Sequence, residues 1–216
     1  MNSLKLFFFI FLLSCPCPGF GNGDFQFWNT ESISWNASDE FRLTLEEEFR
    51  FGDDEPNFFY QHSDLGVVYT GAADWLDIGI NYRHIFEKKT DDWREESRPH
   101  LNATVKWRAC DLSFSNRGCL EYRSRDSAED FWRYRNKLTV GLPWEFTKYA
   151  VRPYVADEIF YDFDANDLIQ NRIYAGLYLT LLKNLTGEVF YFWQLNKQSS
   201  RWDEVHTLGT KLKFCF

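Results

Sequence analysis

The stretch HTLGTKLKFCF, residues 206–216, has the pattern of a β-strand, and this pattern predicts the fold of the chain. Successive residues of a strand point to opposite faces, so two sets of side chains separate here. One face carries His206, Leu208, Thr210, Leu212, Phe214 and Phe216. The other face carries Thr207, Gly209, Lys211, Lys213 and Cys215. A strand that alternates in this way and finishes on an aromatic residue is typical of the closing strand of an outer-membrane barrel.

The same alternation runs through most of the chain. Its clearest example is residues 40–51, where Phe41, Leu43 and Leu45 share one face and charged residues occupy the other. Glu47 interrupts the apolar face, so we expect a bulge or an interfacial position there. Charged residues recur at every second position and not on a 3.6-residue face, which excludes a helical fold. We predict strands at 25–36, 40–51, 58–71, 75–86, 100–109, 112–124, 131–142, 151–163, 169–182, 185–197 and 204–216.

The connections between these segments alternate in length. Short connections are expected at 37–39, 71–74, 110–111 and 183–184, and longer, charged ones at 52–57, 87–99, 125–130, 164–167 and 196–203. Segment 143–149 is an exception, because it falls among the short turns and is longer than a hairpin needs. Short turns at one end and long loops at the other are characteristic of outer-membrane barrels, with the short turns in the periplasm.

The predicted fold class is therefore all-β, a transmembrane antiparallel up-and-down β-barrel of 10–12 strands. A single-chain barrel with both termini in the periplasm has an even number of strands. The eleven segments should then become ten or twelve, and we favour twelve.

The N-terminal residues resemble an export signal. Lys5 precedes eight apolar residues, 6–13, which are too few to span a membrane but suit the apolar region of a secretory signal. Small residues near Gly21 favour cleavage there, which gives a signal peptide at 1–21 and a single barrel domain at 22–216. The run LLSC, residues 12–15, offers the alternative of lipidation at Cys15. Either processing route predicts export to the bacterial outer membrane.

The amino-acid composition indicates a barrel wall that has lipid on one side and water on the other. Aromatic residues make up 19% of the chain and charged residues 26%, and the two kinds are interleaved. The formal net charge of −8 argues against nucleic-acid binding. Cys110, Cys119 and Cys215 remain after signal removal, and we expect them to be unpaired. The sequence contains no Cys-x-x-Cys pair or zinc pattern, and we expect no cofactor.

Four further stretches carry a resemblance to a known family. They are LTLEEEFRF (43–51), NYRH (81–84), RPYVADEIFYD (152–162) and NRIYAG (171–176). Together they resemble an uncharacterised family of Gram-negative outer-membrane β-barrel proteins, known as a domain of unknown function, over about residues 27–216. The resemblance implies a monomeric barrel in the outer membrane, surrounded by lipid and lipopolysaccharide. It brings no reaction or catalytic residue with it.

The closing strand also resembles an assembly signal. Gly209, Leu212, Phe214 and Phe216 match the spacing that the barrel-assembly machinery recognises. We therefore expect that machinery to be a partner of the chain.

The polar positions should face the lumen if the apolar ones face lipid. The predicted lumen-lining charged residues are Arg42, Glu46, Glu48, Arg50, Arg117, Glu121, Arg123, Arg133, Arg135, Lys137, Arg152, Glu158, Arg172 and Glu188. Basic residues gather on the segments at 112–124 and 131–142, whereas segment 40–51 is rich in acid. These charges either pair and close the lumen, giving a structural barrel, or set up a field across a narrow channel. Inward aromatic residues, among them Tyr154, Phe160, Tyr174, Tyr178, Phe190 and Phe192, argue against a wide pore.

Two alternatives remain open. Lipid-modifying barrels place histidine, serine and a carboxylate at the outer rim, and His84 and His100 flank the predicted 87–99 loop where they could meet. His62 and Ser63 are neighbours in sequence and point to opposite faces, so a role as an enzyme is expected less than a structural or channel role. An exported, soluble, lipocalin-like barrel would also alternate, but with its apolar side chains inward.

Overall fold

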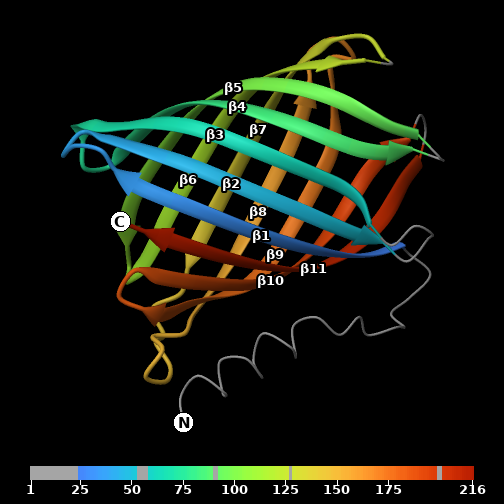
Figure 1. The fold of residues 1–216 in the computed structure, drawn as a ribbon. Coiled ribbons are helices and arrows are strands. Elements are labelled where there is room, and N and C mark those ends of the chain that lie inside the picture. Colours follow the sequence, from blue (N-terminus) through green and yellow to red (C-terminus); the bar gives the residue numbers. More distant parts are fainter. Residues whose placement is uncertain (1–23, 53–57, 90–91, 127, 199–200) are drawn as a thin grey trace.

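The computed structural model describes residues 24–52, 58–89, 92–126, 128–198 and 201–216 (Figure 1). The predicted signal peptide at 1–21 and the alternative lipidation site at Cys15 lie outside these residues. Within the described part, no helix has the length and apolar character needed to cross a membrane.

The chain forms a closed β-barrel (Figure 1). The order around the barrel follows the chain from β1 to β11, so every neighbouring pair up to β10–β11 is antiparallel. This confirms the predicted all-β barrel. The strands are β1 (Asp24–Asn36), β2 (Phe41–Gly52), β3 (Phe58–Ala73), β4 (Leu76–Lys89), β5 (Asp92–Ala109), β6 (Leu112–Arg125), β7 (Phe131–Gly141), β8 (Arg152–Asp162), β9 (Asp167–Leu182), β10 (Leu185–Gln198) and β11 (Arg201–Cys215).

The barrel closes through a parallel pair, which corrects the expected even number of strands. β1 pairs with β11 in parallel, from Asp24 opposite Val205 to Ser34 opposite Cys215. The N–H of Phe216 extends this closure by donating to the carbonyl of Ser34 at 2.9 Å. The described residues thus form eleven strands, and twelve was wrong. The even-number rule assumes that both ends of the barrel chain lie on one side, whereas β1 begins at the end of the barrel opposite Phe216.

Two ends of the barrel can be distinguished by their connections. The end at which Phe216 lies, here called the turn end, carries the connections 37–40, 74–75, 110–111, 142–151 and 183–184. The opposite end, here called the loop end, carries the other connections and the start of β1. Figure 1 shows the turn end on the left, beside the label of the C-terminus.

The expected contrast in loop length is wrong in part. Lys89 pairs with Asp92, so most of the predicted 87–99 loop is a continuation of β4 and β5. Gln198 pairs with Arg201 in the same way at the β10–β11 connection. Charge interrupts the alternation of these segments and so predicts loops, yet the backbone pairs through them. The longest connection between described strands, 142–151, lies at the turn end, as its sequence predicted.

The two faces of the wall have opposite character. Phe41 and Leu45 of β2 are 44% and 41% exposed on the outside, whereas Glu48 is 8% exposed inside the barrel. Charges therefore point inward and apolar side chains outward. This excludes the lipocalin-like alternative, which requires the reverse arrangement.

The outer surface is banded. Exposed aliphatic residues lie between two zones of aromatic rings, and they include Ile33, Leu45, Leu65, Val67, Ile80, Leu101, Leu138, Val155, Ile173 and Leu208. The aromatic zone toward the turn end contains Trp35, Phe41, Trp75, Trp107, Trp144, Phe146, Phe214 and Phe216. The zone toward the loop end contains Phe51, Trp93, Trp132, Phe163 and Trp202. An apolar band flanked by aromatic girdles is the surface pattern of a barrel in a bilayer.

A polar stripe interrupts this band on one side of the barrel. Glu31 of β1 lies opposite Glu47 of β2, which lies opposite Ser63 of β3, and Ser63 lies opposite His84 of β4. All four belong to the outward-facing set of their strands. Of the two outcomes expected at Glu47, a bulge or an interfacial position, the bulge is not found: the described β2–β3 pair is regular at Glu47, and its register shifts between Arg50 and Phe51.

Candidate functional site: a charged lumen with an arginine layer

Two cavities lie inside the barrel. One, of about 220 Å³, is lined toward the loop end by residues such as Glu87, Glu96 and Arg123. The other, of about 160 Å³, is lined toward the turn end by residues such as Glu188 and Lys211. Residues from strands all around the barrel line both, which places the cavities in the lumen. Each has room for several water molecules, at roughly 30 Å³ of liquid volume per molecule.

Five residues line both cavities and so form the boundary between them. They are Trp28 of β1, Arg50 of β2, Arg83 of β4, Arg135 of β7 and Arg172 of β9. We call the four guanidinium side chains the arginine layer. Their strands are spread around the barrel, so the layer approaches the axis from several sides.

Arg50 is held between two aromatic rings. Its guanidinium carbon lies 3.5 Å from the ring centroid of Trp28 and 3.8 Å from that of Tyr60. Its Nη2 contacts Glu48 at 2.7 Å. A guanidinium stacked on rings in this way is fixed in orientation while it keeps its full charge.

The other three arginines are held by buried carboxylates. Arg83 contacts Asp64 at 2.7 Å, and Arg135 lies 3.3 Å from Glu121. Arg172 lies 3.6 Å from Glu158, and its Nε donates to the side-chain oxygen of Gln194 at 2.6 Å. These acids balance part of the charge of the arginine layer and prevent its side chains from repelling one another out of the lumen.

The described ion pairs lie within one strand or join strands that are neighbours or next neighbours. Glu121 of β6 contacts Arg133 of β7 at 2.7 Å, and Lys211 of β11 contacts Glu46 of β2 at 2.5 Å. The described ion pairs therefore do not cross the lumen, so the expected alternative in which β2 acids pair with β7 bases and close it is not seen, although both sets of residues line the cavity toward the turn end. The reason is that Glu121 and Glu158 lie among the basic residues of β6, β7 and β9 and neutralise them locally.

Cationic side chains outnumber acidic ones along both cavities. Seven cationic and two acidic side chains line the cavity toward the loop end. Seven cationic and four acidic side chains line the cavity toward the turn end. Asp64 and Glu121 lie behind this lining and reduce the excess without removing it. The lumen is thus positive, although the whole chain carries a net charge of −8.

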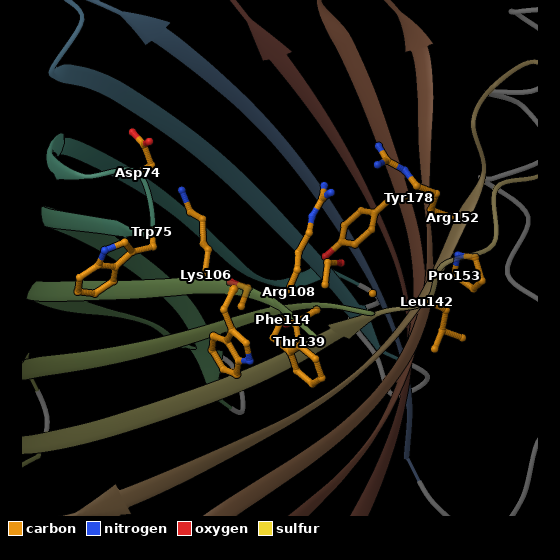
Figure 2. A pocket seen from close by; sticks show the side chains of 14 residues that line it. Asp74, Trp75, Lys106, Arg108, Phe114, Thr139, Leu142, Arg152, Pro153 and Tyr178 are labelled. Carbon is orange, nitrogen blue, oxygen red and sulfur yellow. The ribbon is translucent and has the colours of Figure 1, made fainter. Parts of the chain in front are cut away.

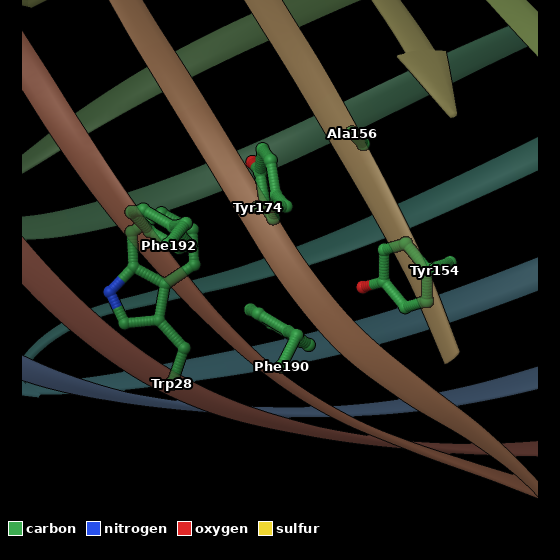
Figure 3. Packing of buried hydrophobic residues seen from close by; sticks show 6 residues of the cluster. All are labelled: Trp28, Tyr154, Ala156, Tyr174, Phe190 and Phe192. Carbon is green, nitrogen blue, oxygen red and sulfur yellow. The ribbon is translucent and has the colours of Figure 1, made fainter. Parts of the chain in front are cut away.

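Aromatic residues fill the side of the lumen formed by β8 to β10 and β1. Figure 3 shows this buried cluster, which consists of Trp28, Tyr154, Ala156, Tyr174, Phe190 and Phe192. Tyr174 donates to Glu158 at 2.8 Å, and the ammonium of Lys137 lies 3.6 Å from the Tyr174 ring centroid. The cluster therefore occupies part of the lumen on this side, and its Trp28 borders both inner cavities.

The structure places the remaining predicted lumen residues at different heights. Arg42 contacts Asp77 at 3.0 Å, and Arg117 lies 3.5 Å from Glu158. Arg123 contacts Glu96 at 2.6 Å. Glu188 accepts a hydrogen bond from Tyr154. Arg152 lines a separate cavity at the turn end.

Several lumen residues were missed by sequence reasoning. These residues point into the barrel, and they are Asp64, Arg83, Glu96 and Arg98. Alternation could have found Asp64 and Arg83. Alternation does not reveal Glu96 and Arg98, because they fall in the loop predicted at 87–99.

The histidines do not assemble as the enzyme alternative requires. Asn81 pairs with His100, and Ser97 pairs with His84, so the two histidines lie on opposite faces of the wall. His84 lies 3.6 Å from Glu95 on the outside, and His100 contacts Asp64 at 2.9 Å inside. The enzyme alternative, in which His84 and His100 could meet at the outer rim, therefore loses this pair.

The chain belongs to the family described as protein of unknown function (DUF2490), whose model matches residues 25–205. This confirms the predicted membership of a family of unknown function. No curated protein matches the sequence. Among solved structures, the chain is similar to an anion-selective porin from Comamonas acidovorans, with a TM-score of 0.42 and 11% sequence identity. The match covers 83% of this chain and 55% of the porin, so the chain spans about half the length of that protein.

Proposed function

We propose that the chain is an outer-membrane β-barrel that acts as a narrow channel with a charged lumen and favours small anions. The observation that carries this proposal is the arginine layer, which forms the boundary between two cavities that each have room for several water molecules. Rings of arginine or lysine are the means by which pores select anions.

The outer surface supports the membrane part of the proposal. A closed barrel satisfies every backbone group of its strands within the sheet, which is the condition for crossing hydrocarbon. The aliphatic band and its two aromatic zones suit acyl chains and the two interfaces respectively. Outer-membrane lipid and lipopolysaccharide are the surroundings we propose, with insertion of a monomer by the barrel-assembly machinery through β11.

The lumen supports the channel part. Each cavity has a polar, predominantly cationic lining, so water and a small anion can occupy it. The carboxylates beside the arginines weaken the binding of an anion, and an ion must leave a site as readily as it enters for conduction to occur. The aromatic cluster and the narrow boundary exclude larger solutes.

A planar bilayer with the purified full chain tests this function. With a salt gradient of roughly tenfold in potassium chloride, we expect a reversal potential with the sign of chloride permeation. Substitution Arg172→Gln should reduce this anion preference, because it removes one charge from the arginine layer while Gln194 can still hydrogen bond.

Arg201→Gln is the matched control, since Arg201 lies at the loop end with its side chain 80% exposed. It should leave the reversal potential unchanged. Heat-modifiable gel mobility shows that each variant is folded. A folded protein that inserts and carries no current at any voltage contradicts the channel and favours a sealed structural barrel. Recovery of the chain as a soluble periplasmic protein contradicts the membrane location.

A further inference from the structure

A third cavity lies at the turn end of the barrel. Its volume is about 640 Å³, and it is lined by residues of β5 to β9 together with the turn between β3 and β4 (Figure 2). It shares no lining residue with the two inner cavities, so it is separate from the arginine layer. Its size lies in the range of ligand pockets, about 300–1,000 Å³.

Three cations line this cavity, and they differ in their partners. Lys106 contacts Asp77 at 2.7 Å, and Arg42 binds the same carboxylate at 3.0 Å. Arg108 and Arg152 have neither an ion pair nor a side-chain hydrogen bond to any residue of the described ranges. Figure 2 shows the two side chains with the ring of Tyr178 between them. Two guanidiniums without partners in one cavity are an arrangement that an oxyanion would stabilise.

Neutral groups complete the cavity. The hydroxyls of Ser113, Ser115 and Thr139 offer hydrogen-bond donors beside the arginines. The ring of Tyr178 also lines the cavity and is stacked on Tyr154, with centroids 4.4 Å apart and an interplanar angle of 21°. Tyr154 in turn donates to Glu188, which fixes the pair of rings. The cavity therefore combines cations, hydroxyl donors and a rigid aromatic surface.

We propose that the turn-end cavity binds a small organic oxyanion, a phosphate or carboxylate on an aromatic or aliphatic body. Arg108 and Arg152 bind the charged group, the hydroxyls orient it, and the body packs on Tyr178. The site depends on the barrel fold but not on conduction, because it lies outside the arginine layer.

Binding of phenyl phosphate to the purified full chain in detergent tests the site, with phenol as the neutral counterpart. Isothermal titration calorimetry should show saturable binding of phenyl phosphate and much weaker binding of phenol. The double variant Arg108→Gln/Arg152→Gln should bind phenyl phosphate at least about tenfold more weakly, since it removes both partners of the anion.

Two controls separate this site from the channel. Arg201→Gln should bind phenyl phosphate as the natural chain does. Arg172→Gln should also retain binding while its ion selectivity changes, so the two proposals fail independently. Equal affinity in the natural chain and the Arg108→Gln/Arg152→Gln variant, or equal affinity for phenol and phenyl phosphate, overturns the site. Absence of saturable binding in a folded natural chain overturns it as well.

Discussion

The carboxylate of Glu121 contacts the guanidinium of Arg133 at 2.7 Å, and Glu121 is 1% exposed. The same carboxylate lies 3.3 Å from Arg135, so one acid on β6 serves two arginines of β7. A pair buried to this extent is costly to break, because removal of one partner leaves a charge without compensation. Glu121 is thus one of the two buried acids, with Glu158, that neutralise the basic side of the lumen.

Substitution Glu121→Gln should lower the free energy of unfolding by about 3–5 kcal/mol. The reason is that Arg133 and Arg135 lose their shared carboxylate while they stay buried. Urea titration in detergent, followed by gel mobility, measures the change. Glu145→Gln is the control, because Glu145 is exposed in the 142–151 connection. If Glu121→Gln and Glu145→Gln unfold at the same urea concentration, the buried pair does not stabilise the barrel.

Substitution Trp28→Ala should increase single-channel conductance. Trp28 lines both inner cavities, and its ring orients Arg50 at 3.5 Å, so its loss widens the boundary and frees that arginine. Loss of a buried aromatic ring should also cost about 3–5 kcal/mol of stability. Trp202→Ala, in the outer aromatic zone, should leave conductance unchanged. A lower or equal conductance for Trp28→Ala would show that the path does not pass this ring.

The double variant Glu31→Leu/Glu47→Leu should stabilise the protein in lipid bilayers. These two carboxylates lie opposite each other on the outer face, and a charged residue facing hydrocarbon costs up to about 2 kcal/mol. Unfolding by urea from lipid vesicles measures the gain. Glu129→Leu, at the loop end, should give no comparable gain. A loss of stability in the double variant would mean that something other than lipid covers the polar stripe.

Gly209 of β11 lies against a ring of the lumen. A Cβ atom there would lie 2.2 Å from Cζ of Phe190, so Gly209→Ala should cost about 1–3 kcal/mol through overpacking. Gly52→Ala is the control, since the nearest atom to its Cβ would lie 3.5 Å away. Combination of Gly209→Ala with Phe190→Leu should restore stability. If the combined variant still fails to assemble into a barrel, then Gly209 acts through recognition of β11 by the assembly machinery and not through packing against Phe190.

Much of the fold could be predicted because period-two alternation directly encodes which face of a strand meets which solvent. The alternation in residues 40–51 placed Phe41 and Leu45 outside and Glu48 inside, as the structure has them. The number of strands could not be predicted by the same route. It depends on whether β1 and β11 meet in parallel, and this pairing joins residues more than 180 positions apart.

The types of residue that line the charged lumen could be predicted from the sequence, but the way in which they are arranged could not. The alternation of inward and outward positions predicts Arg50, Arg135 and Arg172 in the lumen. Their convergence at one height, however, depends on strand tilt and register around the whole barrel. The neutralisation of β7 by Glu121 and Glu158 depends on the same registers. Arg108 falls within the predicted strand 100–109, and its sequence position indicates no role, because its lack of a partner is visible only in three dimensions.

The central claim is that lipid covers the apolar outer face while the lumen is aqueous. The direct test replaces the native cysteines with serine and attaches a fluorophore at Leu45→Cys or Thr44→Cys, neighbours on opposite faces of β2. In lipid vesicles, a quencher carried on acyl chains should quench the label at position 45 and spare the one at 44. Equal quenching at both positions, or quenching at position 44 alone, would contradict the account.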